Sequence, residues 1–570
     1  MLTVTINKTK IQTEPKQTIL AVAEANNIAI PTLCYHPDLA PGASCRLCVV
    51  EIKGKPGLHT ACSTVIEDGM EIITDSPLIK ETRKTNLELI TAQHQISCVT
   101  CSVQSNCALK KSVRTTRANL NRYPKRKANY PTCAFGPALQ FNRAKCIDCR
   151  NCVVVCAKQG INFLEIQPED GFLQVLPSKK PNVDCIYCGQ CFVHCPVGAF
   201  EEVSALNVIE EQLNNKNRTK KIVFQFAPSI RTSIGEEFHL PHGAIVTNQL
   251  SGALWQLGAD VVFDVALGAD VTTVEEAKEL VERIKENKPL PMFTSCCPAW
   301  VKYVEFYHPE LIPHLTTVRS PQIISGGIIK THWAKQQGIK PEDIIVVSIM
   351  PCVSKKYEIT RNELNINGQK PVDYVLTTRE LATLLRKHKI DLAKVEPKPA
   401  ELTIGASSSA GVIYGASGGV MESALRTAYF QLTGASLPKL EYEAVRGQTG
   451  IKKSSIKIGE RTLQLAVVSG INNAQTIIAE LKQDPQAYDY VEVMSCWGGC
   501  IGGGGQPLPT SAKIRQDRAQ SLYNIDTAAK IREAHTNPAV QTIYQDGLIN
   551  EDMIHKVCHT KFVQKEKEVS

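Results

Sequence analysis

Twenty-two cysteines gathered in short groups constrain this 570-residue chain more than any other feature of its sequence. Many neighbouring cysteines are separated by only two, three or five residues, and none lies between Cys195 and Cys296. Disulfide-rich scaffolds are usually small secreted chains, and the N-terminus here shows no secretory signal. Thiolates at this spacing converge readily on a metal but are poorly placed for many separate disulfides. The sequence therefore favours metal clusters.

The first cysteine group has the spacing C-x10-C-x2-C-x13-C and lies in a segment with strand-like alternation. Four soft thiolates on a short β-rich domain favour a 2Fe–2S cluster, and the domain resembles the ferredoxin domains that are fused to redox enzymes. A zinc site is the alternative. The expected ligands are Cys34, Cys45, Cys48 and Cys62.

The second group has the spacing H-x3-C-x2-C-x5-C. A helix would place its histidine and first cysteine on one face, and the three cysteines lack a fourth ligand. A lone histidine is usually only a surface or core residue, but a similar arrangement occurs in the large iron–sulfur subunit of respiratory complex I. We expect a 4Fe–4S cluster bound by His94, Cys98, Cys101 and Cys107.

An internal repeat follows, because the run C-x2-C-x2-C-x3-C occurs twice, 39 residues apart. This is the pattern of bacterial ferredoxins with two 4Fe–4S clusters, in which the fourth cysteine of each run binds the other cluster. One cluster is expected on Cys146, Cys149, Cys152 and Cys195, and the other on Cys185, Cys188, Cys191 and Cys156.

The formal net charge of +8 could suggest a nucleic-acid partner, but it counts every cysteine as neutral. Thiolate-bound clusters carry negative charge, so the loaded chain would be close to neutral. No apolar stretch reaches the roughly 18–20 residues of a membrane helix. We therefore expect a cytoplasmic protein with neither a nucleic-acid nor a membrane partner.

Beyond residue 208, apolar strands alternate with helix-like segments such as Val274–Lys288, which predicts an α/β domain. Cys296, Cys352 and Cys496 each come soon after an apolar strand. Ligand sites in α/β folds form beyond the carboxyl ends of strands, so three distant segments can meet in one cavity. The expected strands are Ile222–Phe226, Val261–Val265, Met292–Thr294, Ile344–Met350, Leu465–Ser469 and Val491–Met494.

These three segments resemble the three signatures of the FeFe (iron-only) hydrogenases, in the family's order. They are Thr294–Trp300 (TSCCPAW), Met350–Glu358 (MPCVSKKYE) and Met494–Pro507 (MSCWGGCIGGGGQP). The accessory cysteine groups match the long clostridial type, so the resemblance covers essentially the whole chain. It implies a monomeric enzyme that interconverts protons and H2, exchanges electrons with ferredoxin or flavodoxin, and needs maturation proteins.

The resemblance also implies an H-cluster, in which a 4Fe–4S cubane joins a diiron subsite bearing carbon monoxide, cyanide and a dithiolate. Cys500 would bridge the two parts, and the glycines of Gly502–Gly505 would let the backbone approach the cofactor. A phosphate loop is the rival interpretation of these glycines, but no Lys-Ser/Thr follows. Cys296 matches the thiol that donates protons there, the alternative being an inert buried cysteine. The expected cubane ligands are Cys297, Cys352, Cys496 and Cys500.

The resemblance implies roles for further residues, by their position relative to the family's sequence. Glu276, Glu279 and Arg283 share a helical face and match the family's proton path together with Thr316, where the family has serine. Without that match, such charges usually form a solvated face. Lys355 matches a lysine that hydrogen-bonds cyanide, and its neighbour Lys356 is expected to be exposed. The residues matched to the cavity lining are Ala227, Pro228, Ser229, Gln322, Met350, Tyr414 and Met494.

One departure from the family is Trp497, which stands where histidine is usual. Tryptophan cannot take up a proton at neutral pH, so proton-coupled tuning of the cubane is not expected there. Cys133 and Cys558 fit no site and are expected to be structural. The basic run Lys111–Lys127 would suit an acidic ferredoxin, although most such runs are only solvated.

Three other functions compete with this interpretation. The chain could belong to a multi-subunit complex that uses NAD(P)H as well as ferredoxin, although it shows no nucleotide-binding fingerprint. It could be a sensory protein, but no regulatory domain is visible. It could be a pure electron-transfer module, which would lack the three signatures.

The fold class expected is multidomain, α+β and α/β. The expected domains are a β-grasp 2Fe–2S ferredoxin-like domain (1–80), a small 4Fe–4S domain with one histidine and three cysteine ligands (81–125), a ferredoxin-like domain with two 4Fe–4S clusters (126–208) and a large α/β catalytic domain (209–570).

Overall fold

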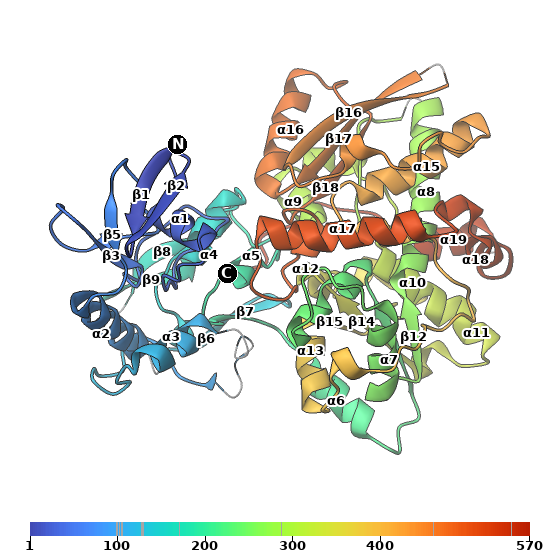
Figure 1. Cartoon of the computed structure of the whole chain (residues 1–570). Coiled ribbons are helices and arrows are strands. Elements are labelled where there is room, and N and C mark those ends of the chain that lie inside the picture. The colour runs from blue at the N-terminus through green and yellow to red at the C-terminus, as the bar shows by residue number, and fades with distance from the viewer. Residues whose placement is uncertain are drawn as a thin grey trace.

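The computed structural model describes residues 1–569 except 99, 100, 102, 104–106, 127–129, 170, 287, 460 and 549. The cysteine-rich N-terminal segments form one lobe, and the large α/β region forms the other (Figure 1). The C-terminal residues return to the first lobe, where the backbone N–H groups of Glu568 and Val569 donate to the Asp184 carboxylate at 3.1 and 3.2 Å. None of the helices in the described part of the chain combines the length and the hydropathy of a membrane span.

A five-stranded sheet opens the chain, in the order β2-β1-β5-β3-β4. Val4 and Ile6 alternate with polar residues on the first strand and are fully buried, as a half-buried strand requires. Helix α1 (Ile19–Ala25) begins at Thr18, whose hydroxyl accepts a hydrogen bond from the backbone N–H of Ala21. The strands are β1 (Leu2–Ile6), β2 (Thr9–Thr13), β3 (Val49–Ile52), β4 (His59–Thr60) and β5 (Glu71–Ile73).

The sequence repeat in the first lobe is also a repeat of backbone conformation. Asp148 and Arg150 have φ values of 55° and 65°, and Tyr187 and Gly189, each 39 positions later, have values of 56° and 71°. In both copies this left-handed turn precedes a short helix, α4 or α5. The remaining bounds are α2 (Pro77–Gln93), α3 (Ala108–Thr116), α4 (Asn151–Lys158), α5 (Gln190–Val193), β6 (Thr132–Phe135), β7 (Leu139–Asn142), β8 (Leu164–Glu169), β9 (Phe172–Pro177) and β10 (Phe200–Glu202).

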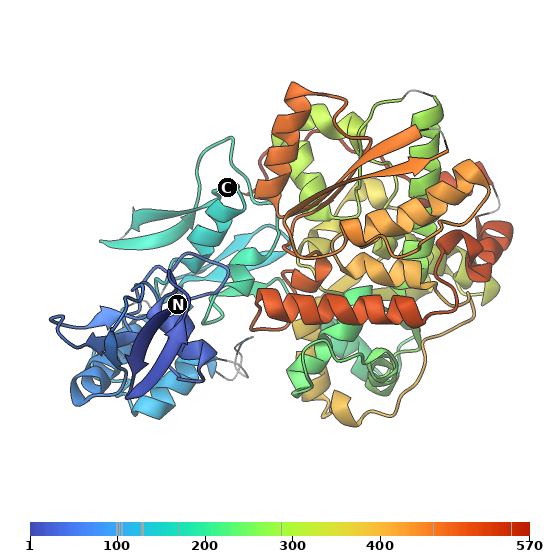
Figure 2. The ribbon, with the colours of Figure 1, turned by 45° about the horizontal axis from the view of Figure 1, so that its top comes forward.

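The second lobe contains two four-stranded sheets with helices packed around them (Figure 2). The first has the order β12-β11-β14-β15 and is wholly parallel. The second has the order β13-β18-β17-β16, with only β16 antiparallel. Their strands are β11 (Lys221–Phe226), β12 (Val261–Asp264), β13 (Met292–Phe293), β14 (Ile344–Met350), β15 (Tyr374–Thr377), β16 (Ile451–Ile458), β17 (Arg461–Ser469) and β18 (Tyr490–Met494).

Long helices surround both sheets, and α17 runs along the surface between them (Figure 1). The helices of this lobe are α6 (Leu206–Asn214), α7 (Thr247–Leu257), α8 (Val265–Lys285), α9 (Pro298–Tyr307), α10 (Pro321–Ile328), α11 (Ala334–Gln336), α12 (Ser354–Glu358), α13 (Thr378–Lys387), α14 (Ser409–Val412), α15 (Gly419–Thr433), α16 (Ile471–Gln483), α17 (Ala512–Ala528), α18 (Pro538–Thr542) and α19 (Glu551–Cys558).

Two local predictions need correction, one in where a helix begins and one in whether two residues share a helix. The helix expected over Val274–Lys288 is α8, which starts directly after β12, with the Asp264 side chain capping it. Its first turns are buried on every side and therefore lack the amphipathic period that marks a helix in sequence. His94 and Cys98 share no helix either, because α2 ends at Gln93 and His94 already has an extended backbone.

Candidate active site

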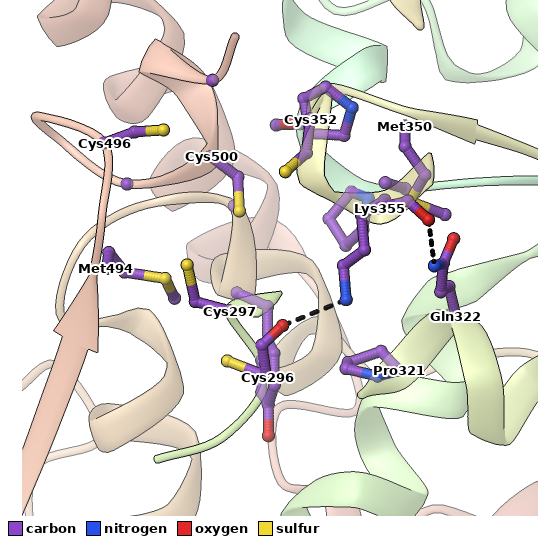
Figure 3. A pocket seen from close by; sticks show the side chains of 18 of the residues that line it. Cys296, Cys297, Pro321, Gln322, Met350, Cys352, Lys355, Met494, Cys496 and Cys500 are labelled. Carbon is purple, nitrogen blue, oxygen red and sulfur yellow. Dashed lines mark hydrogen bonds between the residues drawn. The ribbon is translucent and has the colours of Figure 1, made fainter. Parts of the chain in front are cut away.

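A buried cavity lies where strands of both sheets end (Figure 3). Strand β11 leads into Ala227–Ser229, and β14 leads into Met350–Cys352. From the other sheet, β13 leads to Cys296 and Cys297, and β18 leads into Met494–Cys496. Because the strands within each pair are parallel, their carboxyl ends open at the same edge, where ligand sites of α/β folds form.

Four cysteines from three distant segments face this cavity: Cys297, Cys352, Cys496 and Cys500 (Figure 3). Burial raises the pKa of the thiols of Cys352, Cys496 and Cys500. Thiolates at these positions therefore need a compensating cation. Soft sulfur donors around a dry space are what iron–sulfur clusters prefer. The residues present thus fit the cubane expected from the sequence.

The glycine run is needed for contacts between backbone segments. A Cβ at Gly503 would lie 2.2 Å from the carbonyl oxygen of Pro351. A Cβ at Gly504 would lie 2.8 Å from both the carbonyl oxygen of Cys188 and the Cα of Gly189. Glycine therefore lets the third signature pack against the second signature and against the ferredoxin-like segment, a contact that the sequence analysis did not anticipate.

Cys296 and Lys355 lie side by side at the cavity wall. Burial, followed by the nearby Glu276 carboxyl, raises the pKa of the Cys296 thiol, which therefore keeps its proton. The Nζ of Lys355 donates to the carbonyl oxygen of Cys296 at 3.0 Å and to the Glu358 carboxylate at 3.0 and 3.1 Å. The expectation that Lys356 is exposed was wrong, because it is buried in an ion pair with Glu380.

Beyond Cys296, helix α8 presents two carboxyl groups in different surroundings. The buried Glu276 accepts a hydrogen bond from the Tyr490 hydroxyl at 2.8 Å, and burial raises its pKa to about 8. Glu279 accepts from Thr316 at 2.8 Å through Oε2, and Arg283 donates to its Oε1 at 2.6 and 3.0 Å. Thr316, Glu279 and Arg283 therefore form one network. The Oε2 of Glu276 has no hydrogen-bond partner among the described residues.

Side chains from the signatures hold the cavity lining in place. Gln322 donates to Glu358 at 2.6 Å, and Gln506 donates to the Ser229 hydroxyl at 3.2 Å. The sequence analysis missed Glu358 and Gln506, although both stand in signature segments. It also missed Tyr490, for which the sequence offered no signal. The residues expected to line the cavity and found there are Ala227, Pro228, Ser229, Gln322, Met350, Lys355, Tyr414 and Met494.

The first accessory group is compact and buried. The sulfur atoms of Cys48 and Cys62 lie 3.4 Å apart, and the backbone N–H of Cys45 donates to the Cys34 sulfur at 3.4 Å. All four cysteines of this group are buried. Their convergence suits one small metal cluster.

His94 is arranged as metal-ligating histidines usually are. Its Nδ1 lies 2.7 Å from the carbonyl oxygen of Lys145. A backbone carbonyl on one ring nitrogen orients the ring and leaves the other nitrogen, Nε2, for a metal. Cys107 caps helix α3 by accepting from the backbone N–H of Lys110 at 3.4 Å.

In the doubled cysteine run, the fourth cysteine of each copy lies near thiols of the other copy. Burial raises the pKa of the Cys149 thiol, and the first neighbouring thiol to add to this is Cys195, from the other copy. Burial likewise raises the pKa of Cys191, and Cys156 is among the thiols that contribute. These neighbours are the ones that the crossed ligand sets require.

The ferredoxin-like segment touches the cavity directly. The Cys496 sulfur lies 4.0 Å from the carbonyl oxygen of Cys188, and Gln190 donates to the carbonyl oxygen of Gly502 at 3.1 Å. Trp497 stands at the same boundary, with the Lys158 ammonium 4.7 Å from its ring centroid. Of the two unassigned cysteines, Cys558 is fully buried in the core.

Comparison with known families matches four segments of the chain. Residues 220–504 match the iron-only hydrogenase large subunit, C-terminal domain. Residues 1–77 match a 2Fe–2S iron–sulfur cluster binding domain, and residues 145–199 match a 4Fe–4S dicluster domain. Residues 512–565 match the iron hydrogenase small subunit.

Two similar proteins match essentially the full length of this chain. Iron hydrogenase 1 of Clostridium pasteurianum is 38% identical over 576 residues, which cover 99% of this chain and 100% of the relative. The NADP-reducing hydrogenase subunit HndD of Solidesulfovibrio fructosivorans is 36% identical over 585 residues, with both chains fully covered. A solved structure of the [FeFe]-hydrogenase HydA1 from Chlamydomonas reinhardtii is 35% identical, with a TM-score of 0.58 over 63% of this chain and 99% of that one. The chain therefore belongs to the FeFe hydrogenase family, with iron–sulfur cluster domains joined to the hydrogenase domain.

Proposed function

We propose that this chain catalyses the reversible reaction of two protons and two reduced ferredoxins to H2 and two oxidised ferredoxins. The observation that carries this proposal is the meeting of five cysteines, from three signatures, around one buried cavity. Cys297, Cys352, Cys496 and Cys500 would hold the cubane, and Cys500 would bridge to the diiron subsite with its carbon monoxide, cyanide and dithiolate ligands. The bound cluster supplies the redox chemistry and the making and breaking of the H–H bond.

The protein's own part is to hold and move protons. The Cys296 thiol remains protonated because burial disfavours its anion. Glu276 is itself neutral below about pH 8, so it can replace a proton that Cys296 gives up. Thr316 and Glu279 would continue the path toward the surface. Lys355, fixed by Glu358, places a positive charge at the cavity wall where a cyanide could accept a hydrogen bond.

The accessory centres would carry electrons to the cavity. We assign them to one 2Fe–2S and three 4Fe–4S clusters on the ligand sets given above. The contact between Cys188 and Cys496 supports the last transfer, because it brings the ferredoxin-like segment against the cubane ligands. The basic segment that begins at Lys111 offers a surface for an acidic ferredoxin or flavodoxin; its end at Lys127 lies outside the described residues.

A second function is favoured by one comparison. HndD, which matches along its full length, is a subunit of an NADP-reducing hydrogenase, so this chain could be a subunit that exchanges electrons with partner subunits. Size-exclusion chromatography of native extract distinguishes a monomer from a complex. Assays with reduced ferredoxin and with NADPH, each as the sole electron source, then identify the donor.

Infrared spectroscopy of the matured full chain tests the central proposal. We expect bands from iron-bound carbon monoxide and cyanide, together with H2 production from reduced ferredoxin. Cys500→Ser should lose both the bands and the activity, because it removes the bridging sulfur. A matured wild-type chain without these bands would contradict the proposed H-cluster.

A further inference from the structure

The outer carboxyl group of the path, Glu279, has no open position on either oxygen. Its Oε1 accepts two hydrogen bonds from Arg283. Its Oε2 accepts from the Thr316 hydroxyl at 2.8 Å, from the Thr317 backbone N–H at 2.9 Å and from the Thr317 hydroxyl at 3.0 Å. A carboxylate oxygen has two lone pairs, so a proton from outside must arrive through one of these donors.

Only one of the donors can pass a proton in from the surface. A guanidinium does not deprotonate in proteins, and a backbone amide does not exchange fast enough for catalysis. The Thr316 hydroxyl is fully buried on the inner side. The exposed hydroxyl of Thr317 remains, and its other partner is His559, whose Nδ1 lies 2.8 Å away.

His559 is oriented by a second acid on α8. Its Nε2 lies 3.1 Å from Glu275, which also accepts a hydrogen bond from Tyr544. Burial raises the pKa of Glu275, but the hydrogen bonds from His559 and Tyr544 outweigh it, and the net shift is downward. Glu275 therefore stays ionised and holds a proton on Nε2, which directs Nδ1 toward Thr317.

Solvent reaches this arrangement. A cavity of about 390 Å³ is lined by Glu275, Glu279, Arg283, Thr317 and His559. The His559 side chain is 17% exposed. His559 follows the last helix, α19, so the C-terminal segment forms one wall of the cavity.

We propose that His559 is the residue that takes up protons from solvent and delivers them through the Thr317 hydroxyl to Glu279. This inference rests on the proposed hydrogenase function. It assigns Arg283 a positioning role, fixing the carboxylate of Glu279, in place of the relay role expected from the sequence.

The transfer balances without another reactant. The imidazolium gives its Nδ1 proton to the Thr317 oxygen, and the Thr317 hydroxyl gives its own proton to Oε2 of Glu279. Neutral His559 keeps its Nε2–H, which is hydrogen-bonded to the Glu275 carboxylate, and then takes the next proton from solvent at Nδ1. In the direction of H2 oxidation, each of these steps runs in reverse.

The groups that face His559 come from several elements. Glu275, Lys278 and Glu279 line the same cavity from α8, and Tyr544, in the π-helix Ile543–Gly547 after α18, donates to Glu275. His555 stacks on His559 from one turn earlier on α19, with ring centroids 6.0 Å apart. Arg319 donates to the backbone carbonyl of His559 and not to its ring.

The test uses the matured full chain with a reduced dye as electron donor. We expect His559→Ala to lower H2 production by roughly a hundredfold, the lower end of what a positioned proton donor contributes, and to increase the solvent isotope effect. Imidazole added to the buffer should restore much of the rate and, by calorimetry, should bind to His559→Ala alone. His555→Ala, the matched control, should keep the wild-type rate and bind no imidazole.

A second pair of variants separates proton delivery from folding. Thr317→Val should lose as much activity as His559→Ala, and Thr317→Ser should keep it, because serine retains the hydroxyl. Hydrogen production by the wild type tests the proposed function independently. Wild-type rates in both His559→Ala and Thr317→Val would then overturn the His559 proposal alone.

Discussion

The Tyr490 hydroxyl donates a hydrogen bond of 2.8 Å to Oε1 of Glu276, so the strand that delivers Cys496 also fixes the inner acid of the proton path. Both side chains are buried, on β18 and α8. Burial raises the pKa of Glu276 to about 8, while the bond from Tyr490 acts in the opposite direction because it stabilises the anion. The position of this carboxyl group therefore depends on one phenol, and its charge depends on burial, which the hydrogen bond from that phenol opposes.

This relationship predicts the pH dependence of H2 production. Glu276 carries a proton below about pH 8 and is ionised above it, so H2 production should fall as the pH rises through 8. Tyr490→Phe removes a bond that favours the anion, raises the pKa of Glu276 further and should move this fall to higher pH. Rate measurements across the pH range test the direction.

The matched control for this prediction is Tyr488→Phe. Tyr488 lies two residues earlier and donates to the peripheral Glu480, so its loss should leave the pH profile unchanged. An unshifted profile in Tyr490→Phe, with intact infrared bands, would contradict the assignment of the fall to Glu276.

Replacing Cys296 should separate proton transfer from cluster binding. Cys296→Ala should lower H2 production by about 10²–10⁴-fold, because a positioned proton donor contributes that much. The infrared bands of the bound diatomic ligands should persist, because Cys296 is not among the proposed ligands. Cys352→Ser is the comparison, since it should disturb the cluster itself. Loss of the bands in Cys296→Ala would show that this thiol binds metal.

A structural feature could be predicted from the sequence when the residues that determine it are close together in the chain. The cysteine spacing indicated the crossed ferredoxin-like sets, and the position of Cys352 after an apolar strand indicated a place at the cavity. Each cysteine run, and the step from an apolar strand to Cys352, is a pattern of neighbouring residues that the sequence shows directly. The start of α8 could not be read, because its first turns are buried on all sides and show no period.

The contacts that control the acids could not be predicted either. Tyr490 and Glu276 are 214 positions apart, and His559 and Glu275 are 284 apart. Each pair meets only because the sheet register and the C-terminal fold bring it together. A tyrosine on an apolar strand looks like a core residue, and a histidine after a short helix looks like a surface residue.

Removing Arg426 should destabilise the second lobe. Its guanidinium is fully buried between Glu422 and Asp526, at 2.7 and 2.8 Å, and so ties α15 to α17. Arg426→Met would leave buried carboxylates without one of their partners, at a cost of about 3–5 kcal/mol. Calorimetry should show a lower unfolding temperature.

The control is Lys439→Ala, which breaks the exposed pair with Glu443 and should change the unfolding temperature little. Equal effects of the two variants would contradict this account.

Gly504→Ala should slow the supply of electrons more than the chemistry at the cavity. Its new Cβ would meet the Cα of Gly189 and the carbonyl oxygen of Cys188 at 2.8 Å, and both are backbone atoms that cannot rotate away. The ferredoxin-like segment must therefore shift away from the cavity, which lengthens the path between the proposed cluster of Cys188 and the cubane. Ferredoxin-driven H2 production should fall severalfold. Exchange between D2 and water protons needs no external electrons and should be largely retained.

Gly42→Ala is the control for this prediction, because its Cβ would lie an ordinary 3.9 Å from the carbonyl oxygen of Cys149. A parallel loss of both activities in Gly504→Ala would place the damage in the cavity itself and contradict an electron-transfer role for this contact.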